Sequence, residues 1–311
     1  MSGSNGAWKS NAPGDMPGLR YFAAMLDRDP ADKPDHSAVQ WDQRAEEWEK
    51  EYSDPAQAKS DDRVDAAVDY LSGKGILGPE CDVVDIGCGP GRFVTAFART
   101  ARHVLGIDIS ERMVHYGAAY AQREGVRNAS FHVCDFQALD IEKEGLAGKF
   151  DLVFSSITPA IHGVHGLEKT MRMSRKYCCN ITHIHSENEL ESRIMREVFQ
   201  RDRPDPWAKH WHWFYATFNI LLLMGYYPEA TYNIRRLEKT IQPGPDYIKR
   251  FSGQMLSAKE CTPENEGRIL DWLKVHANAE GLVAETSDFW YGRLLWDVQA
   301  KTNRPAIWPE E

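Results

Sequence analysis

A glycine-rich turn stands between a hydrophobic run and a helical pattern in the first third of the chain. The run Val83–Ile86 leads directly into the sequence GCGPG at 87–91, and the helical pattern begins near Arg92. Glycine allows a sharp turn and lets a ligand approach the backbone without a side chain in the way. The N–H groups at the start of the helix add donors and a partial positive charge. Because the turn joins a strand pattern to a helix pattern, we interpret it as a ligand-binding turn.

Acidic residues end the next two apolar runs. Asp108 follows Gly87 by about 20 residues, where a carboxylate can accept hydrogen bonds from both hydroxyls of a ribose. Asp135 closes a further run and is followed by Phe136, a pair that could bind the amino group of adenine and flank its ring. The alternatives are a solvated loop carboxylate at 108 and a turn-forming acid beside a core aromatic at 135. The spacing favours an adenosine site.

The elements that must position these residues repeat as strand, turn and helix from residue 81. This alternation predicts a parallel sheet with helices on both faces. Ligands bind such sheets outside the carboxyl ends of the strands, which is where the turn and both acids fall. The predicted strands contain 83–86, 104–107, 131–133, 152–154 and 177–182, and the helices between them cover 92–100 and 111–124.

Helical patterns flank this region on both sides. Ser37, with Gln40 three residues later, fits a capping box that opens a helix. Thr262 followed by a proline fits the start of another helix, and 283–298 could supply a last strand. We therefore expect a flexible tail (1–18), an N-terminal helical cap (19–80), a core (81–186), a helical insertion that covers the pocket (187–228) and the remainder of the core with strands six and seven (229–311).

Taken together, the turn and its acids resemble the class I S-adenosylmethionine-dependent methyltransferases of the small-molecule type, most clearly over 81–185. The resemblance implies an α/β, Rossmann-like sheet of seven strands, mostly parallel, with the last strand inserted antiparallel. It implies S-adenosylmethionine as cofactor, with the glycines under its methionine part, Asp108 on the ribose and Asp135 on the adenine. The expected cofactor-site residues are Asp85, Gly87, Cys88, Gly89, Gly91, Asp108, Ile109, Met113, Asp135, Phe136 and Ser155.

A nicotinamide-dependent dehydrogenase is the competing interpretation of a glycine turn with a downstream acid. Its G-x-G-x-x-G pattern would require glycine at the position of Arg92. Asp85, directly before the turn, also favours the methyltransferase, in which it would help to position the methionine amino group.

The methyl acceptor should lie beyond the fourth strand, at residues 155–160. This segment, SSITPA, departs from the Asn/Asp-Pro-Pro-Tyr/Phe sequence typical of enzymes that methylate nucleobase or amide nitrogens. His162 follows closely and is the candidate general base, although holding donor and acceptor in register can suffice without one. The candidate residues for the acceptor pocket are Trp41, Tyr52, Ser156, Thr158, His183, Trp211 and Tyr215.

Composition narrows the possible partners. The formal net charge of −9 argues against a broad nucleic-acid face, which is usually basic. No apolar run approaches the length of a membrane span, and six cysteines without a C-x-x-C pair fit a reduced, cytoplasmic protein. The H-x-H pairs at 183–185 and 210–212 match no familiar ligand set, so we expect no metal. An RNA or protein methyltransferase and a non-catalytic S-adenosylmethionine-binding protein remain the alternatives.

Overall fold

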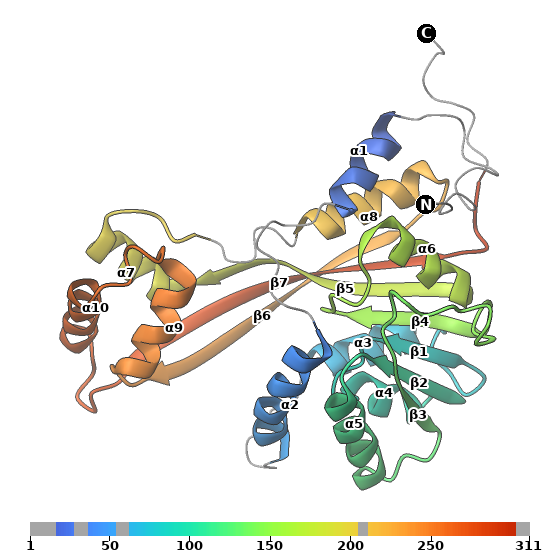
Figure 1. The fold of residues 1–311 in the computed structure, drawn as a ribbon, viewed down its shortest axis with the longest axis horizontal. Helices are drawn as coiled ribbons and strands as arrows, with labels where there is room; N and C mark the ends of the chain where they lie inside the picture. Colours follow the sequence, from blue (N-terminus) through green and yellow to red (C-terminus); the bar gives the residue numbers. More distant parts are fainter. Residues whose placement is uncertain (1–16, 28–36, 54–61, 205–210, 303–311) are drawn as a thin grey trace. The chain divides into compact units, whose positions relative to one another are not determined.

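The computed structural model describes residues 17–27, 37–53, 62–204 and 211–302 (Figure 1). The chain forms two compact units, and each is described by itself. The first unit comprises residues 1–182, 212–231 and 293–311, and the second comprises 183–211 and 232–292.

The strands form one seven-stranded sheet with the order β3-β2-β1-β4-β5-β7-β6. The β1, β2, β3, β4 and β5 strands pair in parallel, whereas Figure 1 shows β7 running opposite to β5. The mixed sheet with its antiparallel last strand confirms the predicted fold class. The strands are β1 (Asp82–Ile86), β2 (His103–Asp108), β3 (Ala129–Val133), β4 (Phe150–Ser156), β5 (Ser174–Asn188), β6 (Glu229–Ile241) and β7 (Val283–Asp297).

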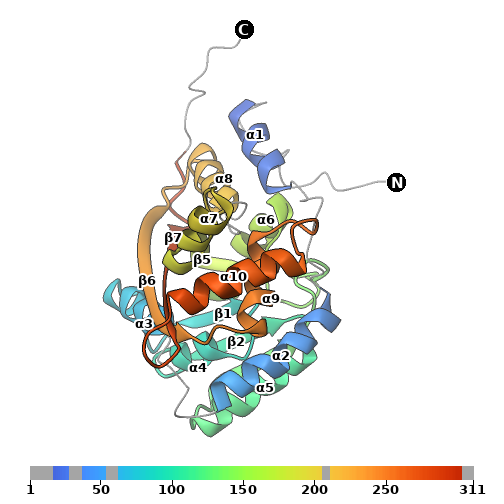
Figure 2. The same cartoon turned by 90° about the vertical axis from the view of Figure 1, so that its left-hand side faces the viewer.

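Helices cover the part of the sheet that belongs to the first unit. The α4 helix (Arg92–Ala98) packs on β1 and β2, α5 (Glu111–Arg123) packs on β2 and β3, and α6 (Gly163–Met173) packs on β4. Figure 2 shows α2 (Ala38–Ser53) alongside α5, in agreement with their contacts. The remaining helices of this unit are α1 (Pro17–Leu26), α3 (Asp62–Gly73) and most of α8 (Trp211–Leu223).

Local sequence explains where these elements begin. Val83, Val84 and Ile86 are fully buried, so the apolar run forms the central strand of the core. The Ser110 side chain accepts a hydrogen bond from the Met113 amide and so caps α5, as N-cap hydroxyls do. The expected caps at Ser37 and Thr262 are likewise present, each accepting from the amide three residues later.

The division into units differs from the predicted boundaries. We expected the fifth strand to end at 182, but β5 continues to Asn188 with no glycine or proline to stop it. Of the predicted insertion at 187–228, α7 (Glu189–Phe199) belongs to the second unit and most of α8 belongs to the first. Of the predicted tail, residues 1–16 lie outside the described part of the chain.

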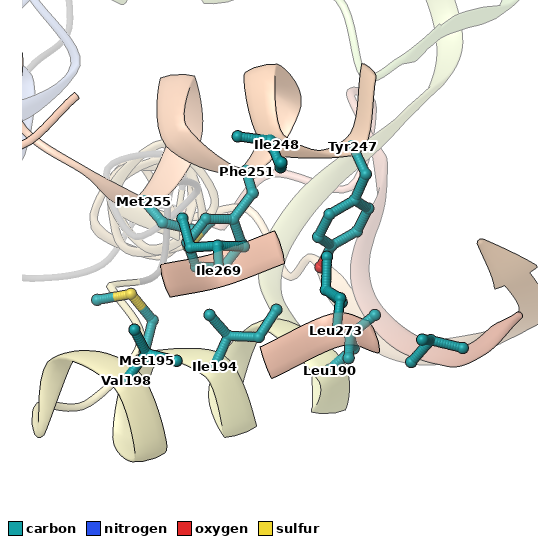
Figure 3. Close-up of a cluster of buried hydrophobic side chains, with 11 residues drawn as sticks. Leu190, Ile194, Met195, Val198, Tyr247, Ile248, Phe251, Met255, Ile269 and Leu273 are labelled. Atoms are coloured by element: carbon teal, nitrogen blue, oxygen red, sulfur yellow. The ribbon is translucent and has the colours of Figure 1, made fainter. Parts of the chain in front are cut away.

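The second unit has a hydrophobic core of its own. Side chains from α7, α9 (Pro245–Met255) and α10 (Pro263–Val275) point toward one another, as Figure 3 shows. Phe251, Ile269 and Leu273 are fully buried in this cluster. Burying such side chains contributes roughly 1.5–3 kcal/mol each. The three helices are therefore held by one shared core.

A buried ionic network lies beside this core. The Glu285 side chain is fully buried and accepts hydrogen bonds from Arg250 at 2.8 Å and from the Asn188 amide at 2.9 Å. Lys239 lies 2.9 Å from the same carboxylate. Burial opposes ionisation of Glu285, but the bonds from Lys239, Asn188 and Arg250 outweigh it and lower its pKa. Glu285 therefore stays charged and fixes strands β5, β6 and β7 to α9 within this unit.

Candidate active site

The glycine turn follows β1 with the geometry that its sequence predicts. Gly87, Gly89 and Gly91 have φ angles of 70°, 50° and 75°, in the left-handed region that favours glycine. The amides of Gly87 and Cys88 both donate to the Ile107 carbonyl, at 2.7 and 3.0 Å. The turn is therefore tied to β2, and Gly91 caps α4.

The three glycines differ in what surrounds them. A Cβ at Gly91 would lie 2.8 Å from the Phe131 ring, so this glycine serves close packing. A Cβ at Gly87 would lie 1.9 Å from the Thr158 hydroxyl oxygen. A Cβ at Gly89 would meet nothing within 4 Å. Gly89 is therefore the position at which a ligand can reach the backbone.

Asp108 at the end of β2 is oriented by the backbone around it. One carboxylate oxygen accepts from the Gly89 amide at 2.9 Å, and the other accepts from the Ser110 amide at 2.9 Å. Partial burial raises the pKa of Asp108, and the bonds from the Ser110 and Gly89 amides oppose that rise. Each oxygen keeps a further lone pair. The carboxylate could therefore accept from ribose hydroxyls while it holds the turn.

Asp85 is the least satisfied acid in this region. Its side chain is 1% exposed, and its Oδ2 atom has no hydrogen-bond partner among the described residues. Burial raises the pKa of Asp85 well above its usual range, and the charge of Asp108 adds to the shift. A buried carboxylate without a partner is costly unless a cation or donor meets it. Its chemistry fits the amino group of a bound methionine moiety.

Asp135 and Phe136 lie just after β3 and differ in exposure. Asp135 is exposed, and its Oδ1 atom accepts from the Gln137 amide at 2.8 Å. The Phe136 ring is 2% exposed and lies 5.2 Å from the ammonium of Lys169. The acid is thus open to a ligand, whereas the aromatic ring is part of the core.

The other predicted cofactor residues lie near the turn with different exposures. Cys88 and Met113 are buried, and Ile109 is half-buried. Ser155 is buried in β4, where its hydroxyl accepts from the Asn180 amide at 2.8 Å. Cys88, Met113 and Ser155 are therefore core residues, whereas Ile109 is partly exposed.

The end of β4 and the loop after it carry three residues predicted for the acceptor end of the site. The Ser156 hydroxyl oxygen is buried and has no partner among the described residues. Ile157 adopts a φ of 49°, a strained conformation for a β-branched residue. Thr158 is half-buried and its hydroxyl accepts from the Ala160 amide at 3.1 Å. His162 is half-buried directly before α6.

The remaining predicted pocket residues are not all in the first unit. His183 belongs to the second unit, where it is buried with ring contacts to Phe289 and Tyr291 at 6.0 and 5.6 Å. Tyr215 is half exposed and packs edge-on against Phe22 at 5.5 Å. Trp41 is half-buried on α2 beneath the Arg44 guanidinium. The side chains of Tyr52 and Trp211 lie outside the described part of the structure.

Sequence reasoning missed several residues that shape the site. Asp42 accepts from the Ser110 hydroxyl at 2.5 Å and so attaches α2 to the start of α5. Gln137 and Lys169 bond the loops that follow β3 and β4. An acid, an amide and a lysine of this kind carry no spacing signal, because their partners are distant in the sequence.

Other features are separate from this site. A small hollow lies at the amino ends of the strands, at the opposite edge of the sheet from the glycine turn. It is lined by Asp82, His103, Leu105, Ser130, Lys149 and Phe150. Among the described residues, no three His, Cys, Asp or Glu side chains are grouped to hold a metal ion. No described helix has the length and hydropathy required to cross a membrane.

Known sequences resemble the part of the chain that carries this site. A family model described as a methyltransferase domain matches residues 77–213. A 23S rRNA (uracil-C5)-methyltransferase of Hahella chejuensis is 43% identical over 53 residues, which is 17% of this chain and 12% of that protein. A ubiquinone biosynthesis O-methyltransferase of Acinetobacter baumannii is 33% identical over 90 residues, which is 29% of this chain and 34% of that protein. The chain thus spans about a third or less of the length of these relatives.

Solved structures of low identity resemble the chain over a longer stretch. A magnesium protoporphyrin IX methyltransferase of Synechocystis with bound S-adenosylhomocysteine has a TM-score of 0.46 at 19% identity, covering 63% of this chain and 90% of that one. A putative methyltransferase of Bacillus halodurans has a TM-score of 0.45 at 14% identity, covering 76% of this chain and 100% of that one. The family match coincides with the glycine turn, the acids and the strand order described above. Residues 77–213 of this chain therefore match a methyltransferase domain.

Proposed function

We propose that this protein transfers a methyl group from S-adenosylmethionine to a small-molecule acceptor. The observation that carries the proposal is the buried Asp85 carboxylate, whose Oδ2 atom lacks a partner in the described structure. It lies directly before a turn whose Gly89 has open space above it. A cationic amino group held over the turn would satisfy the carboxylate and occupy the space.

Different residues of the domain would bind different parts of the cofactor. Asp85 would accept from the methionine amino group, and the turn at 87–91 would lie beneath the methionine part. Asp108 would bind the ribose hydroxyls and Asp135 the amino group of adenine. S-adenosylmethionine, when bound, supplies an electrophilic methyl group on its sulfonium.

The residues of this chain would have to bind the acceptor and, for a hydroxyl or amine acceptor, remove its proton. Methyl transfer is an in-line displacement, so fixing the acceptor in register can provide much of the acceleration. Ser156 and Thr158 lie at the carboxyl end of β4, and ligands bind sheets of this type at the carboxyl ends of their strands. The methyl acceptor would therefore bind near these two residues. His162, half-buried at the start of α6, is the proposed base for a hydroxyl or amine acceptor.

A small acceptor is favoured over RNA by charge. The net charge is −9, whereas proteins that bind a phosphate backbone usually present a basic face. The named relatives include both an rRNA methyltransferase and a ubiquinone-pathway O-methyltransferase, so RNA is the second candidate. The SSITPA segment at 155–160 is a further support for a small acceptor, because it lacks the motif typical of base-amino methylation.

The proposal is tested by labelled methyl incorporation from S-adenosylmethionine. Pools of hydroxylated, amine and thiol metabolites are compared with total RNA and with protein extract. Label in a metabolite pool is the expected result, and label only in RNA or protein would replace the small-molecule proposal with a polymer substrate. Tight cofactor binding without transfer to any pool would favour a non-catalytic binding protein.

Asp108→Ala should weaken the affinity for S-adenosylhomocysteine while the fold is retained. Hydrogen bonds to a charged group contribute about 1.5–3 kcal/mol, so we expect a loss of roughly 10- to 100-fold in calorimetric affinity. Asp140→Ala is the matched control, because Asp140 is an exposed acid whose oxygen likewise accepts from nearby amides. An affinity for Asp108→Ala within about threefold of wild type would contradict the ribose assignment.

A further inference from the structure

Two loops at the carboxyl edge of the sheet are joined by side chains that the proposed chemistry does not use. The first loop, residues 134–137, carries Asp135. The second, residues 157–162, carries Thr158 and His162. Both loops and the residues that join them lie in the first unit. Their connection therefore joins the adenine end of the proposed site to its acceptor end.

Gln137 makes the direct connection. Its side-chain amide donates to the Ala160 carbonyl at 2.6 Å and lies 3.4 Å from the His162 carbonyl. Its backbone amide donates to the Asp135 carboxylate. One residue thus bonds the acid proposed for adenine and the backbone of the acceptor loop.

Lys169 on α6 fixes the first loop from below. Its ammonium donates to the carbonyls of Phe136 and Gln137, both at 2.8 Å, and the side chain is buried. Burial lowers the pKa of Lys169, while the charge of Asp135 opposes that change. A buried lysine whose donors go to backbone carbonyls holds those carbonyls in one orientation. Since α6 begins at Gly163, the same helix also anchors the end of the acceptor loop.

The acceptor loop has a conformation that needs such support. Ile157 lies at a φ of 49°, a strained conformation for a residue other than glycine. Its amide donates to the Ile181 carbonyl at 2.8 Å. Ala160, whose carbonyl Gln137 holds, also donates to the Thr158 hydroxyl, and that hydroxyl lies over Gly87. The bonds therefore run from Asp135 through Gln137 and Ala160 to Thr158, whose hydroxyl lies close to Gly87.

We propose that Gln137 and Lys169 are positioning residues that transmit occupancy of the adenine end to the acceptor loop at 157–162. The inference rests on the proposed function, because Asp135 must meet the adenine for the loop to respond. A ligand that fixes Asp135 stabilises the Gln137 backbone, and the Gln137 side chain then holds the carbonyl of Ala160.

The experiment measures hydrogen–deuterium exchange of the backbone amides of 157–164, with and without S-adenosylhomocysteine. In wild type we expect the ligand to slow this exchange at least about fivefold, the lower end of typical coupling between sites. Gln137→Met keeps the length of the side chain but removes the donor. It should bind the ligand within about threefold of wild type and lose the slowing. Gln122→Met, on the exposed surface of α5, is the matched control and should retain it.

Lys169→Met gives a second test on the same readout, with the exposed Lys143→Met as its control. Equal slowing in Gln137→Met and wild type would overturn the inference, as would binding to wild type without any slowing at 157–164. Failure of S-adenosylhomocysteine to bind wild type would instead overturn the proposed function itself. Loss of slowing in both test variants, with binding retained, supports the positioning role.

Discussion

Asp85 and Asp108 lie on neighbouring parallel strands but differ in the hydrogen-bond partners of their carboxylate oxygens. Asp108 accepts from backbone amides on both oxygens, whereas an oxygen of Asp85 is left without a partner in the described structure. Strand β1 buries Asp85 because its neighbours Val84 and Ile86 are core residues. Strand β1 therefore carries a buried carboxylate oxygen without a partner in the described structure, at the proposed site.

Asp85→Asn should stabilise the ligand-free protein at neutral pH. The folded-state pKa of Asp85 is raised, so the folded state binds more protons than the unfolded state, and stability falls as pH rises above the unfolded value near 3.8. Asparagine lacks this titration, so its unfolding free energy should exceed that of wild type by roughly 1–3 kcal/mol at pH 7 and should converge at low pH. Chemical denaturation between pH 4 and 8 measures the difference.

The control for this prediction is Asp65→Asn, an exposed acid on α3. It should leave the pH dependence unchanged. An unfolding free energy for Asp85→Asn that falls with pH as steeply as that of wild type would contradict the assignment of the titration to Asp85. The variant should also lose affinity for S-adenosylhomocysteine, because a neutral amide meets the amino group less well than a carboxylate does.

Among the elements, the turn between β1 and α4 does most to form the site. Its glycines share positive φ angles, but the structure gives them separate surroundings. Gly91 lies against the Phe131 ring and the Gly117 backbone, whereas Gly89 opens to free space. One turn thus joins a packed position and an open position only two residues apart.

Gly89→Ala and Gly91→Ala should separate stability from binding. Both place a Cβ in the left-handed region, at a cost of roughly 1–2 kcal/mol. Gly91→Ala adds overpacking of about 1–3 kcal/mol against Phe131, so its unfolding free energy should fall further. Gly89→Ala should lose more ligand affinity, because its methyl group enters the open space. Urea unfolding and calorimetry with S-adenosylhomocysteine measure the two quantities, and the reverse ranking in either would refute this division of roles.

At the scale of the whole molecule, the chain has a second hydrophobic core in addition to the core around the sheet of the first unit. The helices α7, α9 and α10 bury their apolar faces together, and the Glu285 network lies beside them. This unit is built from two separate stretches of sequence, 183–211 and 232–292. Its stability can therefore be tested apart from ligand binding.

Leu273→Ala should destabilise the second unit and leave ligand affinity unchanged. Leu273 is fully buried, and such truncations cost about 2–5 kcal/mol. Faster amide exchange should appear in α7, α9 and α10, measured residue by residue because proteins of more than one unit need not unfold in one step. Val275→Ala on the same helix is the control, since Val275 is 80% exposed. A matching loss of S-adenosylhomocysteine affinity in Leu273→Ala would show that binding depends on this unit.

The predictable part of the molecule was local. The alternation of apolar runs, the glycine turn and the acids at 85 and 108 follow from short-range spacing, and the structure has the expected strands around them. The predicted end of the fifth strand at 182 was wrong, because β5 continues to Asn188. The cover predicted at 187–228 stays a prediction, and its helices α7 and α8 fall mostly in different units.

The sequence by itself determined the alternation of strands and helices near the site, the glycine turn and the resemblance to a methyltransferase family, since each depends on residues adjacent along the chain or at a fixed spacing. The tertiary structure decided which polar groups remain unmet, which glycine faces open space and which loops are bonded together. Asp85 lacks a partner, and Gln137 reaches Ala160, only because segments distant in sequence meet at one edge of the sheet. Contacts between distant segments depend on how the chain packs, and spacing along the chain does not specify them.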